Sequence, residues 1–344
     1  MKKLIVVMVN LLCMCGILVG CRSYDEKGKE LNNLKIGVSV YDQYDNFVDE
    51  LLDAISTSAE ALEDKYGISI TLDVQNAGGN QMVQNDQMDY FIDRECDIVC
   101  INLVDRTDAS TIIERGKSAN IPIIFFNREL VEEDLDRWDK LYYVGADAFE
   151  SGIIQGELLV EKLKKDFSAV DQNGDGVIQY VMLEGQAGHQ DTIVRTMYAI
   201  NTVTDAGFEV EKLSDEIANW NRDQGKTKMD QWIQEFGNEI EVVLSNNDAM
   251  AIGAVDALKE KGYYENPDLH APVVLGIDGI KEGLEAVEEG YFLGTVLNDS
   301  AGQAKAMLEL AYSITSDKEL DSEFTLLDGK YIRLPYQKYV KSEE

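Results

Sequence analysis

The chain has 344 residues, with 64 Asp plus Glu against 31 Lys plus Arg and a formal net charge of −33. No basic block compensates for the acidic excess, which excludes binding to nucleic acid or to anionic lipid head groups through charge. The hydrophobic fraction of 45% is that of a folded protein, and the length suits two domains of ~100–200 residues each.

The first twenty residues are typical of a secretory signal peptide. Two lysines precede an apolar run at residues 4–19, which is short for a membrane helix of ~20 apolar residues. The run ends in Leu-Val-Gly-Cys at residues 18–21, which resembles the bacterial lipobox. We therefore expect removal of residues 1–20, a lipid on Cys21 that anchors the chain outside the cytoplasm to the cell membrane, and a polar tether at residues 21–33. A plain signal or a buried apolar helix is the alternative.

Beyond this segment, apolar β-rich runs alternate with amphipathic stretches. The runs are residues 34–40, 68–74, 97–101, 121–125, 141–144, 176–183, 208–213, 241–244, 272–276 and 292–296. The helix-like stretches include residues 46–66, 148–165, 192–206, 247–261 and 300–314. This alternation predicts an α/β protein with helices on both faces of parallel sheets. Ten strands suit two doubly wound sheets better than one.

Polar side chains follow most of these strands, where doubly wound sheets bind their ligands. They lie at residues 45–47, 102–105, 127–128, 188–191, 246–248, 278 and 298–299. Each one alone is explained as an ordinary helix N-cap, and the Asp191–Arg195 spacing as a helix-surface pair. Together, amides, carboxylates and a guanidinium are planar groups that can each bond two neighbouring hydroxyls.

Motifs of several enzyme classes are absent from the sequence. No GxGxxG dinucleotide fingerprint, GxxxxGK[ST] P-loop, GxSxG nucleophile elbow or HExxH zinc motif occurs. The set of polar residues therefore favours ligand binding over these kinds of catalysis.

One polar loop matches the first nine positions of the EF-hand calcium loop. Its oxygen donors and turn glycine are Asp171, Asn173, Asp175, Gly176, the Val177 carbonyl and Gln179. Position twelve should be a bidentate Glu but is Met182, and a strand rather than a helix is predicted to follow. The missing carboxylate must come from elsewhere in the chain, or the loop is a polar turn without a metal.

These features together resemble the bacterial periplasmic galactose/glucose-binding proteins over about residues 35–336. The matching segments include Tyr-Asp-Asn-Phe at 44–47, Ile-Asn-Leu-Val-Asp at 101–105, the loop at 171–179, Gly-His at 188–189, Asn-Asn-Asp-Ala-Met at 246–250 and Gly-Thr-Val-Leu-Asn-Asp at 294–299. The resemblance implies the type I periplasmic-binding-protein fold, with two α/β lobes joined by a three-crossover hinge. We expect lobes at residues 34–121 plus 299–332 and at residues 122–298 plus 333–344.

The resemblance also implies a sugar site and a calcium site. Hydrogen bonds to sugar would come from Asp45, Asn102, His189, Asp191, Arg195, Asn247, Asp278 and Asn298, with Phe47 and Trp220 on the two faces of the ring. Structural Ca²⁺ would be held by Asp171, Asn173, Asp175, Val177, Gln179 and the distant Glu241. Independently, aromatic rings suit the apolar faces of a pyranose, and planar polar groups suit its hydroxyl rim. Three carboxylates against one Arg195 favour a neutral sugar.

The chain departs from the familiar form of that family in its lipobox, in Gln190 where that form has Pro, and in a longer connection at residues 263–270.

The leading hypothesis is a non-catalytic lipoprotein, a monomer, that binds D-galactose or D-glucose and delivers it to the permease of an ABC importer. The alternative is a receptor subunit that signals to a membrane kinase or chemoreceptor. A glycosidase using two carboxylates is disfavoured, since stacking on both sugar faces leaves little room for water. A related transcription repressor is excluded by the signal peptide and the missing basic head.

Overall fold

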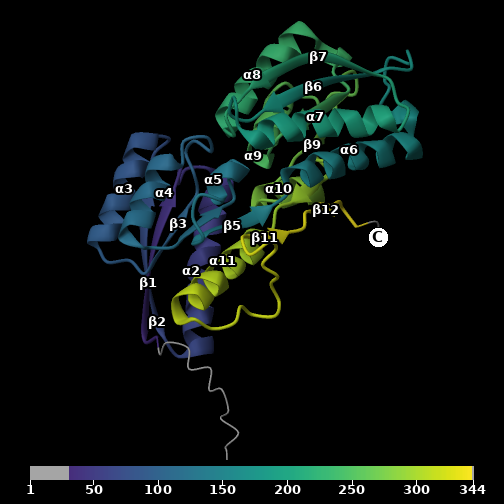
Figure 1. Ribbon diagram of the computed structural model, residues 1–344. Helices are drawn as coiled ribbons and strands as arrows, with labels where there is room; N and C mark the ends of the chain where they lie inside the picture. The colour runs from purple at the N-terminus through teal and green to yellow at the C-terminus, as the bar shows by residue number, and fades with distance from the viewer. Residues whose placement is uncertain (1–30, 343–344) are drawn as a thin grey trace, which may run out of the picture.

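The computed structural model describes residues 31–342 as two α/β lobes (Figure 1). The expected signal peptide, the lipidated Cys21 and most of the tether lie outside the described residues. Within residues 31–342, no helix combines the length and apolarity needed to cross a membrane. The predicted α/β class with two parallel sheets is confirmed.

The first lobe is built on a six-stranded parallel sheet with the order β11-β5-β4-β3-β1-β2. Its strands are β1 (Asn33–Val40), β2 (Ser69–Asn76), β3 (Ile98–Ile101), β4 (Ile123–Phe126), β5 (Leu141–Ala146) and β11 (Tyr331–Leu334). Its helices are α2 (Asn46–Tyr66), α3 (Gln81–Asp93), α4 (Ser110–Ala119), α5 (Glu132–Leu135) and α11 (Ser300–Ser316).

Alternating side chains of the central strands explain why helices cover both faces of this sheet. Along β3, Ile98 and Cys100 pack into the core that includes α2 and α11. Val99 and Ile101 point the other way and pack with residues of α3 and α4. All four side chains are fully buried, which is the pattern of a parallel strand with no solvated face.

The second lobe has a four-stranded parallel sheet with the order β7-β6-β8-β9. Its strands are β6 (Ile178–Glu184), β7 (Val210–Ile217), β8 (Val242–Ser245) and β9 (Val273–Leu275), and β10 (Thr295–Leu297) pairs with β12 (Gln337–Tyr339). Its helices are α6 (Ala148–Lys165), α7 (Gln190–Asp205), α8 (Arg222–Glu235), α9 (Asp248–Glu260) and α10 (Lys281–Glu289), with short 3-10 turns η1 (Phe167–Ala169) and η2 (Gly237–Glu239).

The chain crosses between the lobes after β5, after β10 and after β11 (Figure 1). The lobe boundary expected at residues 121/122 is wrong, because β4 pairs with β3 and β5 pairs with β4 in the first sheet. The boundary expected at 332/333 is wrong too, since it would cut β11, which stays paired with β5 through Leu334. A run of apolar residues indicates a strand but carries no information on which sheet that strand joins.

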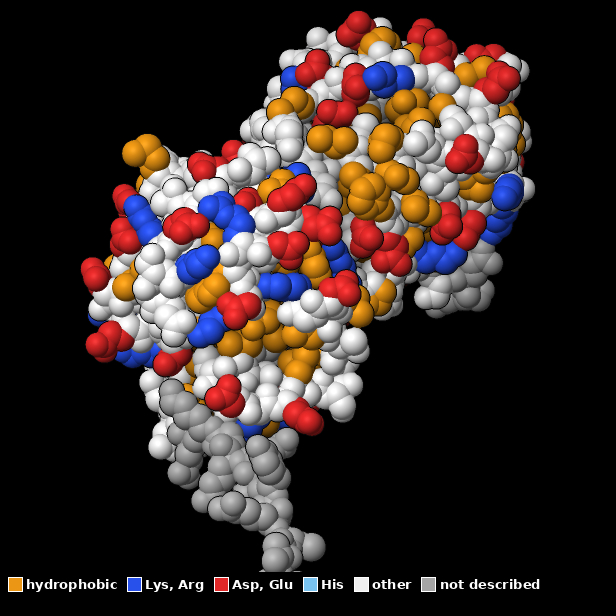
Figure 2. Space-filling model, viewed as in Figure 1, with side chains coloured by type: hydrophobic (Ala, Val, Ile, Leu, Met, Phe, Trp, Pro, Cys, Tyr) orange, Lys and Arg blue, Asp and Glu red, His pale blue; other side chains and the backbone are white. Residues whose placement is uncertain are grey.

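Acidic side chains lie on both lobes of the face shown in Figure 2. Figure 2 shows Asp and Glu side chains scattered across the visible face, with Lys and Arg interspersed among them. No basic area suited to nucleic acid is visible on this face.

Helices α8 and α9 pack unusually closely, because glycines stand at their contact. A Cβ atom on Gly253 would lie 2.1 Å from the carbonyl oxygen of Arg222, and one on Gly225 would lie 2.6 Å from that of Met250. Any larger side chain would force the two helices apart.

We therefore predict that Gly253→Ala destabilises the second lobe by about 1–3 kcal/mol, the usual cost of overpacking. Thermal unfolding followed by circular dichroism measures this loss. Thr227→Ala, on the exposed face of α8, is the control and should change the Tm little. Equal Tm values for Gly253→Ala and wild type would contradict the close packing.

Candidate functional site

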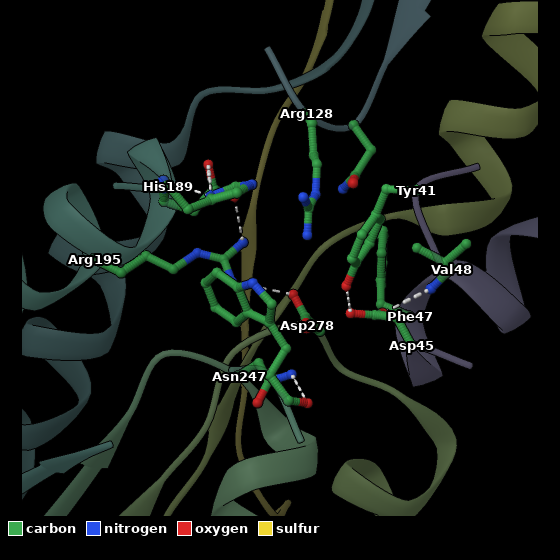
Figure 3. A pocket seen from close by; sticks show the side chains of 12 residues that line it. Tyr41, Asp45, Phe47, Val48, Arg128, His189, Arg195, Asn247 and Asp278 are labelled. Carbon is green, nitrogen blue, oxygen red and sulfur yellow. Dashed lines mark hydrogen bonds and ion pairs between the residues drawn. The ribbon is translucent and has the colours of Figure 1, made fainter. Parts of the chain in front are cut away.

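A cavity lies between the two lobes and receives side chains from both (Figure 3). Its lining residues are Tyr41, Asp45, Phe47, Val48, Asn127, Arg128, His189, Asp191, Arg195, Trp220, Asn247 and Asp278. Nearly all of them directly follow a strand or begin a helix. The cavity therefore occupies the place where parallel α/β sheets bind ligands.

Side chains at helix starts serve as caps and line the cavity at the same time. Asp45 caps α2 by accepting a hydrogen bond from the Val48 amide at 3.1 Å, and Tyr41 donates its hydroxyl proton to the other Asp45 oxygen. Asn247 caps α9 through the Met250 amide, and His189 caps α7 through the Asp191 amide. The capping explanation and the binding explanation of these residues are thus compatible.

The buried guanidinium of Arg195 joins several segments of the second lobe and the hinge. Its Nη1 donates to the Asn246 carbonyl at 2.7 Å and lies 3.4 Å from Asp278. Its Nη2 lies 3.2 Å from Asp191 and donates to the Tyr336 hydroxyl at 3.1 Å. Burial alone would lower the pKa of Arg195, but Tyr336 and the two carboxylates raise it overall. The guanidinium therefore remains charged.

Asp278 sits in a backbone conformation that few residues adopt. Its φ of 120° is in the positive region, where a non-glycine residue is strained. Asp248 holds the loop in this conformation, because its carboxyl group accepts hydrogen bonds from the amides of Gly279 at 2.7 Å and Ile280 at 3.1 Å. Burial raises the pKa of Asp278 to about 7, although the nearby Arg195 opposes this shift. The carboxyl group is therefore near its midpoint of ionisation at neutral pH.

His189 is a neutral imidazole with one nitrogen left for a ligand. Burial, aided by the positive charge of Arg128, lowers its pKa to about 3. Because Nδ1 accepts the Asp191 amide proton at 3.1 Å, the ring proton is on Nε2. The His189 ring meets the edge of Trp220, with centroids 5.3 Å apart.

Three buried donors of cavity residues have no hydrogen-bond partner within the described chain. They are His189 Nε2, Arg195 Nε and Trp220 Nε1. Leaving a buried donor unpaired costs about 1–3 kcal/mol. A ligand rich in hydroxyl oxygens would satisfy such donors.

Eight of the ten residues expected to contact sugar line the cavity, but Asn102 and Asn298 do not. Asn102 is fully buried behind it and donates to the Phe126 carbonyl and to Asn127 Oδ1. Asn298 accepts a hydrogen bond from Gln303 at 2.6 Å and lines a neighbouring cavity that it shares with Asp278. In this arrangement both asparagines support neighbours of the cavity instead of facing it.

Tyr41, Val48, Asn127 and Arg128 line the cavity although they were not expected to bind sugar. For Asn127 and Arg128, the sequence feature that indicates a place in the cavity is their position directly after a predicted strand. Arg128 also changes the charge balance, since three carboxylates now face two guanidinium groups instead of one.

The polar loop at residues 171–179 folds around its own side chains. Asp171 accepts from the amides of Gly174 and Gly176, and Asp175 accepts from that of Val177. Glu241, distant in sequence, reaches the loop: its carboxylate accepts from the Gln172 amide at 2.6 Å and from the Gln179 amide at 3.1 Å.

The loop and Glu241 offer the types of oxygen donor that a hard cation prefers, and in this structure those oxygens accept hydrogen bonds from N–H groups of the loop. The neighbouring Asp171 contributes to raising the pKa of Glu241, although burial is the larger cause. No cluster of three or more His, Cys, Asp or Glu arranged to hold a metal is found among residues 31–342.

Comparisons with known proteins agree with this geometry. Residues 36–319 match the model of the periplasmic binding protein domain. The D-galactose/methyl-galactoside binding periplasmic protein MglB of Haemophilus influenzae is 37% identical over 306 residues, which cover 88% of both chains. A xylitol-binding protein of Mycolicibacterium smegmatis is 29% identical over 84% of this chain and 74% of its own length.

Solved structures show the same architecture. An ABC transporter solute-binding protein from Bacillus halodurans with bound myo-inositol has a TM-score of 0.71 at 27% identity, covering 92% of this chain and 96% of its own. A solute-binding protein from Actinobacillus succinogenes with bound D-allose has a TM-score of 0.74 at 19% identity, covering 90% and 98%, and this likeness shows the fold alone.

These relatives are binding proteins and not enzymes: one is named for galactose binding, and the Bacillus halodurans structure is named as the solute-binding protein of an ABC transporter. The family is extracytoplasmic. The match spans most of the chain, and the two-lobed fold encloses its cavity as a solute-binding protein requires. This chain belongs to the periplasmic binding protein family and has the type I fold.

Proposed function

We propose that this protein is a lipoprotein, anchored through Cys21, that binds a neutral hexose between its lobes and delivers it to an ABC importer. D-galactose and D-glucose are the proposed ligands. The observation that carries the proposal is the buried Arg195–Asp278 pair beside unpartnered donors, in a cavity that also receives Phe47 and Trp220. The likeness to a galactose-binding relative supports the choice of hexose.

The chemistry of the cavity suits each part of such a sugar. The rings of Phe47 and Trp220 offer apolar faces to the C–H faces of a pyranose. Arg195, His189 and Asn247 can donate to hydroxyl oxygens, and the carboxylates can accept from hydroxyl protons. Because residues of both lobes are needed, the sugar would favour the state in which the lobes are closed, and a permease can recognise that state.

We predict that Asp278→Ala and Arg195→Ala each weaken binding of D-galactose or D-glucose by at least tenfold. Each change removes one partner of a buried charge-assisted bond, worth about 1.5–3 kcal/mol. Isothermal titration against a panel of monosaccharides measures the Kd. Arg222→Ala, which breaks a partly exposed ion pair with Asp256 of α9 and does not line the cavity, is the matched control. Binding within threefold of wild type in both cavity variants would refute the site.

We predict that hexose affinity rises between pH 6 and pH 8. The pKa of Asp278 is about 7, so the charged form that accepts hydroxyl protons grows from roughly a tenth to nine tenths of the protein over this interval. If only that form binds, the apparent Kd falls by about tenfold. Titrations at several pH values check this, and Asp278→Asn should remove the dependence. A pH profile shared by wild type and Asp278→Asn would assign the effect elsewhere.

We further propose that Asp171, Asn173, Asp175, the Val177 carbonyl, Gln179 and Glu241 hold one structural Ca²⁺. Glu241 supports this proposal, because it hydrogen-bonds to the loop and supplies the carboxylate that the loop itself lacks. The loop leads directly into β6, and the turn after β6 ends at His189. A bound cation would therefore stabilise the lobe that carries most of the cavity.

We predict that EDTA lowers the Tm and that Ca²⁺ restores it better than equimolar Mg²⁺, because Mg²⁺ demands a tighter octahedral cage. Binding at one hundred times the Kd stabilises the fold by about 2.7 kcal/mol. Glu241→Gln should reduce the response, whereas the exposed Glu239→Gln should preserve it. A Tm indifferent to EDTA, with no calcium by elemental analysis, would leave the loop an ordinary polar turn.

A further inference from the structure

Arg128 is a buried cation that has no anionic partner among the described residues. Its residue is 4% exposed, and its guanidinium forms no ion pair with a carboxylate of residues 31–342. Its hydrogen bonds go to neutral oxygens: the carbonyls of Leu103 at 3.4 Å and Val104 at 3.3 Å, and Gln186 Oε1 at 3.0 Å. Burying an unpaired charge is costly, so this placement needs a physical reason.

Part of the compensation comes from Tyr41. The guanidinium carbon of Arg128 lies 3.2 Å from the centroid of the Tyr41 ring, which is a cation–π contact. The turn that presents Arg128 is firmly held, because the Asn127 amide donates to the Val144 carbonyl and the Tyr143 hydroxyl donates to the Asn127 carbonyl. The Arg128 side chain therefore extends from a rigid part of the first lobe.

The partner Gln186 belongs to the second lobe, in the turn between β6 and α7 that also contains His189. The Arg128–Gln186 bond thus crosses from one lobe to the other. A second bond across the lobes, from the Lys281 amide to Glu50 Oε1 at 2.8 Å, joins α10 to α2. In this structure Arg128 is therefore held by both lobes, through Leu103 and Val104 of its own lobe and through Gln186 of the other.

Arg128 also stands at the boundary of the cavity. Together with Tyr41 and His189 it lines both the inter-lobe cavity and a separate outer cleft. We define this outer cleft by its other lining residues, which include Asp105, Arg106, Thr107, Gln186 and Asn219. Figure 3 shows the Arg128 side chain reaching into the space between His189 and Tyr41.

We propose that Arg128 is a closure residue: by bonding to Gln186 across the cleft it fastens the lobes over the bound sugar and slows sugar release. This inference rests on the proposed sugar-binding function. It assigns Arg128 a positioning role. The residue holds the two lobes together at the wall of the cavity, and it does not change how the other donors contact the sugar.

The test is a double-mutant cycle on sugar release. Arg128→Met removes the guanidinium and Gln186→Met removes its acceptor, while both keep a side chain of similar length. Dissociation of D-galactose and D-glucose is followed by stopped-flow fluorescence. We expect each single variant to release sugar about tenfold faster, the cost of one charge-assisted bond, and the double variant to be no faster than the faster single variant. Equal thermal unfolding of the variants would show that the fold is retained.

Arg106→Met is the matched control. Arg106 lines the outer cleft but donates to the Glu129 carbonyl of its own lobe, so its loss should leave the release rate unchanged. Release within twofold of wild type in both single variants would overturn the proposal. So would effects that multiply in the double variant, or slower release in Arg128→Met, which would show that Arg128 competes with the sugar for space.

A measurement without sugar separates this inference from the proposed function. Spin labels on Met82→Cys and Met197→Cys, both at exposed positions on opposite lobes, report the distance between α3 and α7. The native Cys96 and Cys100 are buried, and burial raises the pKa of both thiols, so they resist labelling in a mature chain that carries Cys21→Ser. Arg128→Met should shift the sugar-free distances toward longer values. An unchanged distribution would overturn the proposal even if no monosaccharide binds.

Discussion

The structure of the site depends on the buried guanidinium of Arg195. It binds the end of β8 through Asn246, the strained loop after β9 through Asp278, and the hinge segment through Tyr336. A charge this deeply buried is tolerated only because each of its partners is held in place. Asp248 holds the Asp278 loop, and the start of α7 holds Asp191 beside it. Loss of one partner leaves the remaining charge uncompensated, so the cavity forms as a unit.

This arrangement explains how one cavity can be both stable and receptive. The carboxylates and guanidiniums satisfy one another in part, which keeps the empty cavity folded. The unpartnered nitrogens of His189, Arg195 and Trp220 remain as donors for a ligand. Residues of the first lobe, chiefly Tyr41, Asp45 and Phe47, complete the site only when the lobes meet. Ligand binding and lobe closure are therefore coupled through shared contacts.

Much of the fold could be predicted from the sequence, because buried parallel strands are apolar along their whole length and helix caps mark the turns between them. The lobe boundary could not, since the apolar run of β4 looks the same whichever sheet it joins. Asn102 and Asn298 carry the same chemistry as true lining residues, and only the three-dimensional packing shows that they face Asn127 and Gln303. Arg128 contacts Gln186 of the other lobe, and no local sequence pattern indicates such a contact between distant segments.

The ring of Trp220 lines the cavity and is 8% exposed, so a sugar bound between the lobes should lie against it. Intrinsic fluorescence during titration with D-galactose and D-glucose tests this claim. We expect a saturable change in the wild-type protein that is lost in Trp220→Phe, although Trp138 and Trp232 remain. The same sugar-induced change in Trp220→Phe would contradict the placement of the sugar between the lobes.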